Sequence, residues 1–116
     1  MKYLLLTWSS EAEWRRLTQE QAADAARRIE AWYRENAQSG RIVQGARLAE
    51  RSMAQTVRLG PAGQSDAPLR SNGPFGSGAE SIGSYTIVEA DSMEDALRVA
   101  EAWPAGGSIE VRPLYE

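Results

Sequence analysis

The chain has 116 residues, of which 42% are hydrophobic and 25% are charged, and its formal net charge is −3. This length corresponds to a single domain over residues 1–116, and the composition is that of a globular protein and not of a disordered one. Because a weakly acidic chain lacks the basic surface typical of nucleic-acid-binding proteins, we expect no direct contact with nucleic acid.

The sequence contains no cysteine and no histidine. The first absence excludes disulfides and thiolate chemistry, and the second removes the usual metal ligand, the usual general base and every histidine-containing dyad or triad. We therefore expect no cofactor and no metal, although an oxygen-only Mg²⁺ site stays open, and catalysis is disfavoured. The apolar run Tyr3–Leu6 is too short for a signal peptide or a membrane span, which predicts a cytoplasmic protein without membrane contact.

Residues 2–8 predict a strand with apolar side chains on both faces. Tyr3 and Leu5 point to one face, whereas Leu4 and Trp8 point to the other. A strand of this kind belongs in the centre of a sheet that is covered on both faces.

A helix is predicted over residues 19–39. It follows the polar segment 9–17, which has room for one helical turn around Trp14. Thr18 and Gln21 have the spacing of a capping box, and an apolar stripe at helical spacing runs from there to Gly40, which ends the helix. The stripe consists of Ala22, Ala25, Ala26, Ile29, Trp32, Tyr33 and Ala37.

Shorter strands and a glycine-rich loop are expected next. Strands are predicted over 41–49, 55–59 and 68–71, and the last two form a hairpin whose turn is the segment 60–66, rich in turn-forming residues. Residues 72–83 contain four glycines and one proline, which indicates an ordered loop.

The last third of the chain repeats the strand–helix–strand theme. A strand is predicted over 82–90, a helix begins at 91–94 and ends at Pro104, and a final strand covers 108–113. The order β-α-β, hairpin, β-α-β predicts an α+β, ferredoxin-like fold. Two helices cover only one face of such a sheet, so the large apolar side chains of the other face predict a homodimer formed through the open sheet face.

The most distinctive local sequence is Ser-Asn-Gly-Pro-Phe at 71–75, followed by Glu80, Gly83 and Tyr85 and later by Val-Arg-Pro at 111–113. With these residues the chain resembles the DGPF family, a branch of the YCII-related proteins. The resemblance also includes the opening Met-Lys-Tyr-Leu-Leu-Leu, the helix start Leu-Thr-Gln-Glu and the terminal Gly-Ser-Ile-Glu-Val-Arg-Pro, so it extends over nearly the whole chain. It implies a dimeric α/β-barrel arrangement of the ferredoxin-like domain.

The chain departs from the family pattern in its charges. Asn72 stands where the family signature begins with Asp. The family usually has three charged residues at positions 77, 79 and 80, and this chain keeps only the last of them, Glu80, because Ser77 and Ala79 replace the other two. Some YCII-like proteins are credited with a His-Asp pair, which a chain without histidine cannot supply.

Five residues are candidates for contact with a small-molecule ligand. Without the family, the loop also has a structural interpretation, which we favour, in which Phe75 anchors it in the core. Glu80 and Arg112 form either an ion pair or the lining of a polar pocket, and the sequence leaves both open. The candidates are Trp8, Asn72, Phe75, Glu80 and Arg112.

Two functions are compatible with these features. The leading hypothesis is a non-catalytic or small-ligand-binding accessory protein, and the resemblance implies a regulatory setting because family members are often found beside extracytoplasmic-function sigma factors. The alternative is an enzyme that acts on a small organic molecule in a pocket closed by loop 72–80. A polar pocket around Glu80 and Arg112 favours the enzyme, whereas a loop packed shut on Phe75 favours the accessory role.

Overall fold

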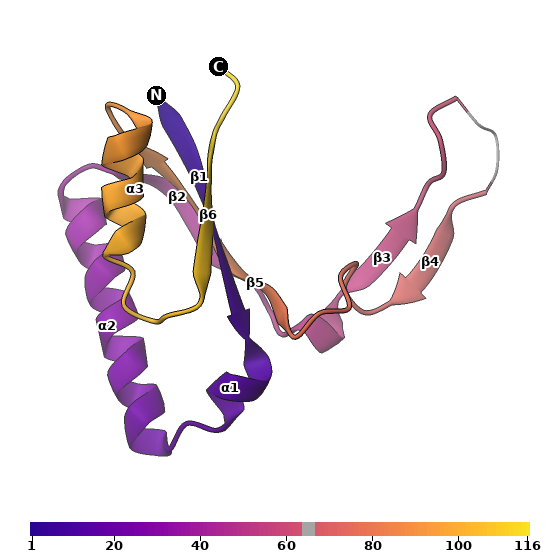
Figure 1. Cartoon of the computed structure of the whole chain (residues 1–116), viewed down its shortest axis with the longest axis horizontal. Helices are drawn as coiled ribbons and strands as arrows, with labels where there is room; N and C mark the ends of the chain where they lie inside the picture. Colours follow the sequence, from indigo (N-terminus) through magenta and orange to yellow (C-terminus); the bar gives the residue numbers. More distant parts are fainter. Residues whose placement is uncertain (64–66) are drawn as a thin grey trace.

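A computed structural model describes residues 1–63 and 67–116, and Figure 1 shows the arrangement of its helices and strands. In chain order the elements are β1 (Lys2–Ser10), α1 (Glu11–Arg15), α2 (Gln19–Gln38), β2 (Ile42–Arg47), the 3-10 turn η1 (Arg51–Met53), β3 (Gln55–Arg58), β4 (Leu69–Asn72), β5 (Glu80–Glu89), α3 (Met93–Glu101) and β6 (Ser108–Pro113).

Four of the strands form an antiparallel sheet in the order β2-β5-β1-β6. Helix α2 connects β1 to β2, and β5 lies between these two strands in the sheet. Helix α3 connects β5 to β6, and β1 lies between these two strands. The predicted α+β class is therefore confirmed, and this strand order is consistent with a ferredoxin-like fold. The predicted central position of the first strand is also confirmed, because β1 pairs on both edges.

Helix α2 begins where the capping-box spacing predicts. The hydroxyl of Thr18 accepts a hydrogen bond from the backbone N–H of Gln21 at 3.1 Å, and the side chain of Gln21 accepts one from the N–H of Thr18 at 3.0 Å. These bonds satisfy N–H groups that have no partner within the helix. Gly40, with a φ of 77°, takes the left-handed conformation just beyond the helix end.

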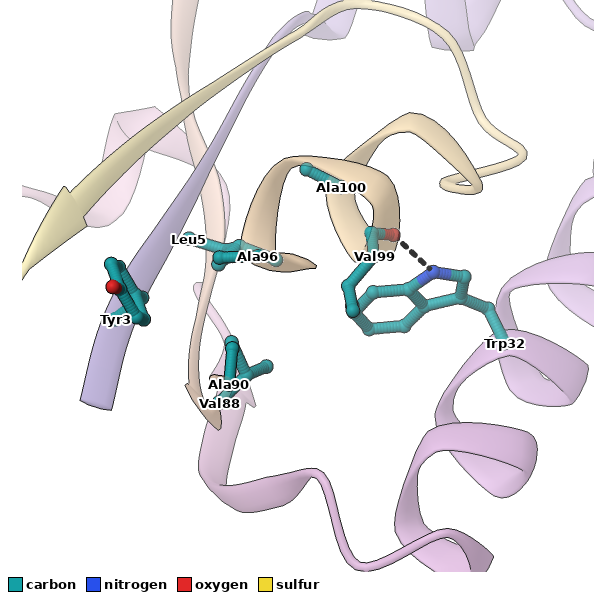
Figure 2. Packing of buried hydrophobic residues seen from close by; sticks show 8 residues of the cluster. All are labelled: Tyr3, Leu5, Trp32, Val88, Ala90, Ala96, Val99 and Ala100. Atoms are coloured by element: carbon teal, nitrogen blue, oxygen red, sulfur yellow. Dashed lines mark hydrogen bonds between the residues drawn. The ribbon is translucent and has the colours of Figure 1, made fainter. Parts of the chain in front are cut away.

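The core lies between one face of the sheet and helices α2 and α3 (Figure 2). Tyr3, Leu5 and Val88 contribute from the sheet, and the indole of Trp32 packs against α3 and donates a hydrogen bond to the carbonyl of Val99 at 3.2 Å. The rings of Trp32 and Trp103 meet edge to face, with centroids 5.1 Å apart. Each buried side chain of this size stabilises the fold by roughly 1.5–3 kcal/mol.

The other face of the sheet carries apolar side chains that no helix in the described part of the chain covers (Figure 1). On this open face Leu4 and Leu6 of β1 lie beside Ile87 and Tyr85 of β5, and all four are half-buried. Leu4 and Leu6 are thus covered by their strand neighbours, and not by a second layer.

Strands β3 and β4 confirm the predicted hairpin, and they form a two-stranded sheet of their own that projects from the main sheet (Figure 1). The turn predicted over 60–66 includes residues 64–66, which lie outside the described residues. The glycine-rich loop is shorter than predicted and covers 73–79, because Glu80 already pairs with Ser10 at the extended end of β1. Within residues 1–63 and 67–116, no helix has both the length and the apolarity needed to cross a membrane.

Candidate functional site

The helix-facing side of the sheet changes from apolar to hydroxyl-bearing along its length. On β1 the core residues Tyr3 and Leu5 are followed by Thr7, and on β5 the residue opposite Thr7 is Ser84. The two buried hydroxyl oxygens lie 2.5 Å apart, and the hydroxyl of Thr7 also donates to the carbonyl of Ser84 at 3.3 Å. Ser9 continues this row towards the end of β1, where the sheet extends beyond the core. The floor of the space beneath α2 is therefore polar.

Helices α1 and α2 cover this floor and leave a cleft. Ser10 caps α1 by accepting a hydrogen bond from the N–H of Glu13 at 3.3 Å, and the next residue, Trp14, is half-buried in the cleft wall. The cleft consists of two pockets of about 680 Å³ and about 320 Å³, and Ser9 and Trp14 line both. We call the pocket on the side of β6 the outer compartment and the pocket on the side of β2 the inner compartment. Volumes of this size suit small organic ligands.

The two compartments differ in what surrounds them. The inner compartment is lined by the hydroxyls of Thr7 and Ser84, by Trp103 and Ile29, and by the edge of β2 at Arg47. The outer compartment lies between α2, the start of β5 and the loop before β6, and both compartments are open to solvent. Its polar lining includes Glu13, Asp24, Arg28, Glu80 and Ser108.

Several charges at the cleft are already paired. The carboxylate of Asp24 lies 3.1 Å from Arg28, and that of Glu11 lies 3.4 Å from Arg15. The second oxygen of Glu11 accepts the backbone N–H of Arg51 at 2.8 Å. Exposed pairs of this kind contribute little to stability, but the bond to Arg51 joins α1 to the segment that leads into the hairpin.

Arg51 in turn holds the glycine-rich loop by its backbone. Its guanidinium donates to the carbonyl of Gly78 at 2.9 Å and, more weakly, to those of Gly76 at 3.4 Å and Ala79 at 3.5 Å. Sequence reasoning missed this residue, because a single arginine in a segment without periodicity gives no signal of the carbonyl groups it will meet.

The prediction that Phe75 anchors the loop in the core is wrong. Its side chain is 76% exposed, and the guanidinium of Arg58 lies over the ring, 5.5 Å from the ring centroid. The loop is fixed through its backbone instead: the N–H of Gly73 donates to Ala54 at 2.8 Å, and its carbonyl accepts from Thr56 at 2.8 Å. A loop held in this way needs no aromatic anchor.

The structure does not bring the predicted ligand-binding residues together. Glu80, at the start of β5, lines the outer compartment of the cleft. Trp8 and Arg112 lie on the open face of the sheet, and Asn72 ends β4 in the hairpin. The suggested pair between Glu80 and Arg112 does not form.

Arg112 pairs with Glu110 instead. The two residues are two positions apart on β6 and so share one face of the strand. In the described part of the chain, no three carboxylates gather closely enough to hold a metal ion.

The ion pair with the clearest electrostatic effect lies away from the cleft. The guanidinium of Arg41, just before β2, donates to the carboxylate of Asp95 in α3 at 3.0 Å. This hydrogen bond, followed by one from the N–H of Asp91, lowers the pKa of Asp95, and the same bond to Asp95 raises the pKa of Arg41. The pair ties the entry of β2 to the start of α3.

Two comparisons with known proteins bear on the family to which the chain belongs. Over 118 aligned residues the chain is 29% identical to a protein of Rhizobium meliloti (strain 1021) that is itself described as uncharacterised, and the alignment covers 98% of this chain and 92% of that protein. Residues 1–116 match the family described as the YCII-related domain. Because the match extends over the whole sequence, this chain belongs to the YCII-related family.

Proposed function

We propose that this protein is a small-molecule-binding accessory protein whose ligand lies in the cleft between α2 and the hydroxyl-bearing end of the sheet. The observation that carries the proposal is the combination of a polar floor, made by Thr7, Ser9 and Ser84, with an aromatic wall at Trp14. Pockets for small ligands typically combine apolar and aromatic walls with a few placed polar groups.

The lining also indicates the chemistry of the ligand. Hydroxyl groups both donate and accept hydrogen bonds, and an indole offers a flat apolar surface. The carboxylates of Asp24 and Glu11 are occupied by arginines. A ligand with one aromatic ring and one or two neutral hydrogen-bonding groups fits this lining best.

An enzyme that acts on such a molecule is the second candidate. It is favoured by Glu80, whose side chain lines the outer compartment and is the one family-signature charge that the sequence keeps. In that case Glu80 acts as a general acid or base, and Glu80→Gln abolishes turnover while binding persists. An accessory protein shows no turnover with either side chain.

We also propose that the protein acts as a homodimer through the open sheet face. The half-buried apolar side chains of β1 and β5 on that face, including Leu4, Leu6 and Ile87, support this arrangement. The dimeric barrel and the regulatory setting beside sigma factors are supported by the family resemblance alone.

The ligand site is tested by titrating the ¹⁵N-labelled protein with phenol, benzamide and indole while recording amide chemical shifts. We expect shifts at Thr7, Ser9 and Ser84, and binding at least ten-fold weaker in Trp14→Ala, the range for loss of one aromatic contact. Tyr115→Ala is the matched control, because it removes an exposed ring outside the cleft.

Two results would contradict the proposal. The first is binding that Trp14→Ala leaves unchanged in a protein whose thermal unfolding remains cooperative. The second is a set of shifts centred on Leu4 and Arg112, which would place the ligand on the open face near Trp8.

A further inference from the structure

The projecting hairpin exposes an unusual amount of apolar surface. We call residues 54–63 and 67–75 the hairpin arm. Its apolar side chains Val57, Leu59, Leu69 and Phe75 are 54%, 67%, 68% and 76% exposed. In the described part of the chain, neither β3 nor β4 packs extensively against any other helix or strand. Clustered exposed apolar side chains on one element normally mark an interface.

The pairing register of β3 and β4 places apolar side chains on both faces of the arm. Val57 pairs with Arg70 on one face, and Leu69 pairs with Arg58 on the other. Phe75 lies near Arg58 and so extends the second face. This face combines two apolar side chains with one arginine, a composition common in protein–protein contacts.

The arm is held in a fixed direction at its base. The N–H of Gly73 donates to Ala54, Thr56 donates to Gly73, and Arg51 binds the carbonyls of the loop that follows. A two-stranded hairpin alone is marginally stable in water, and it needs a further strand or a packed surface to be stable. The base bonds orient the arm, but they do not supply that surface.

The accessible surface of the chain is larger than a compact protein of its mass requires. The chain exposes 8426 Å², whereas a folded monomer of 12.7 kDa exposes about 6,200 Å². Its radius of gyration is 16.7 Å, against about 13 Å for a compact domain of this length. The difference, roughly 2,200 Å², exceeds the roughly 800 Å² that each partner contributes to a standard interface.

Charge indicates which partner covers the arm. Residues 54–75, which include the arm, contain two arginines and one acidic residue, a net charge of +1, which leaves −4 for the rest of a chain whose total is −3. A basic arm and an acidic body are complementary, so one copy of this chain attracts the arm of another. An isologous dimer then uses each contact twice.

We propose that the hairpin arm binds the body of a second copy of this chain, with Leu69 and Phe75 as its apolar anchors. The inference rests on the proposed homodimer and deepens it, because it adds a second contact to the one through the open sheet face. The charge difference between arm and body, together with the excess surface, carries the choice of a second copy over any other occupant.

Sedimentation equilibrium measures the dimer dissociation constant of the full chain and of Leu69→Asp and Phe75→Asp. We expect each substitution to raise the constant at least ten-fold, because an acidic group is then placed against the acidic partner. Tyr115→Asp is the matched control, since Tyr115 is a fully exposed aromatic residue outside the arm, and its constant should remain within about two-fold of the parent.

A cross-linking experiment locates the contact. The chain has no cysteine, so Ser71→Cys provides a unique attachment point for a photoreactive benzophenone on the second face of the arm. With a mixture of ¹⁴N and ¹⁵N protein, we expect cross-links between copies, from the arm to residues outside 51–79 of the other chain.

The outcomes separate the two proposals. If the full chain dimerises but the arm variants keep its dissociation constant and Ser71→Cys cross-links only within one chain, the arm proposal is overturned and the homodimer stands. If the full chain is monomeric at micromolar concentration, both are overturned.

Discussion

Gly107, in the turn before β6, lies against the backbone of β1. Its φ is 79°, and a Cβ at this position would collide with the carbonyl oxygen of Trp8. Its neighbour Gly106 has a similar φ of 70° but no atom within 4 Å of the place where a Cβ would lie. The two glycines therefore separate the cost of a left-handed conformation from the cost of a steric clash.

We expect Gly107→Ala to lower the free energy of unfolding by about 2–4 kcal/mol, because conformational strain and a backbone collision add. Gly106→Ala should cost only about 1–2 kcal/mol, the strain alone. Urea unfolding of both variants and of the parent checks this at one protein concentration. Equal losses would mean that the turn moves away from Trp8 freely.

Asp95 gives the stability of the fold a predictable dependence on pH. Its hydrogen bond from Arg41 lowers its pKa in the folded state, so its contribution is present above the unfolded pKa, near 3.8, and is lost as pH falls through the lower folded value. We therefore expect the parent to have a larger free energy of unfolding than Asp95→Asn at pH 7. In urea unfolding from pH 7 to pH 2.5, this difference should disappear below about pH 4.

Arg41→Gln is the companion variant for this measurement. It removes the donor that lowers the pKa of Asp95, so it should remove most of the same pH-dependent contribution. If the difference in free energy of unfolding between the parent and Asp95→Asn stays constant from pH 7 to pH 2.5, Asp95 acts through helix capping alone.

Among the elements, the glycine-rich loop depends on a side chain from another segment. Residues 73–79 contain no hydrophobic anchor in the core, and Arg51 binds three of their carbonyl groups. Ala79, which Arg51 contacts, and Glu80, at the start of β5, both line the outer compartment, so this contact lies beside the cleft.

Arg51→Ala should speed hydrogen exchange of the amides in 76–80 about ten-fold and lower the free energy of unfolding by about 1–2 kcal/mol, since several bonds from a charged donor are lost. Arg58→Ala is the control, because Arg58 lies over the ring of Phe75 and belongs to the same hairpin region. Unchanged exchange in Arg51→Ala would mean that the loop keeps its conformation without the guanidinium.

At the scale of the whole molecule, local patterns in the sequence predicted the elements but not the site. The capping box at Thr18 and the two-faced strand 2–8 predicted the start of α2 and the central position of β1, because each pattern lies within a short run of the sequence. The cleft depends on how far α2 extends past the core, and its floor consists of Thr7 and Ser84, which are 77 residues apart. A threonine and a serine so far apart in the sequence carry no signal that their side chains will be hydrogen-bonded in the fold.

For Phe75 the sequence predicted a core contact that the structure does not contain. A large aromatic residue among glycines suggests an anchor when only the loop is considered, but burial depends on a surface that the loop does not reach. For Arg112 the sequence left open an ion pair with Glu80 or a place in the lining of a polar pocket, whereas its ion pair is with Glu110 on the same strand face.

The central position of β1 has a consequence for how the chain folds during synthesis. Strand β1 precedes both of its partners in the chain, and it pairs along one edge with residues 80–89 and along the other with residues 108–113. Neither partner exists while β1 and α2 are emerging, and α2 lacks the sheet surface against which its apolar stripe packs. Contacts of such long sequence separation form slowly, because most of the chain must close into a loop first. The two-faced apolar strand therefore remains unpaired until residues 80–113 have been synthesised, and until then it exposes apolar surface of the kind that chaperones bind.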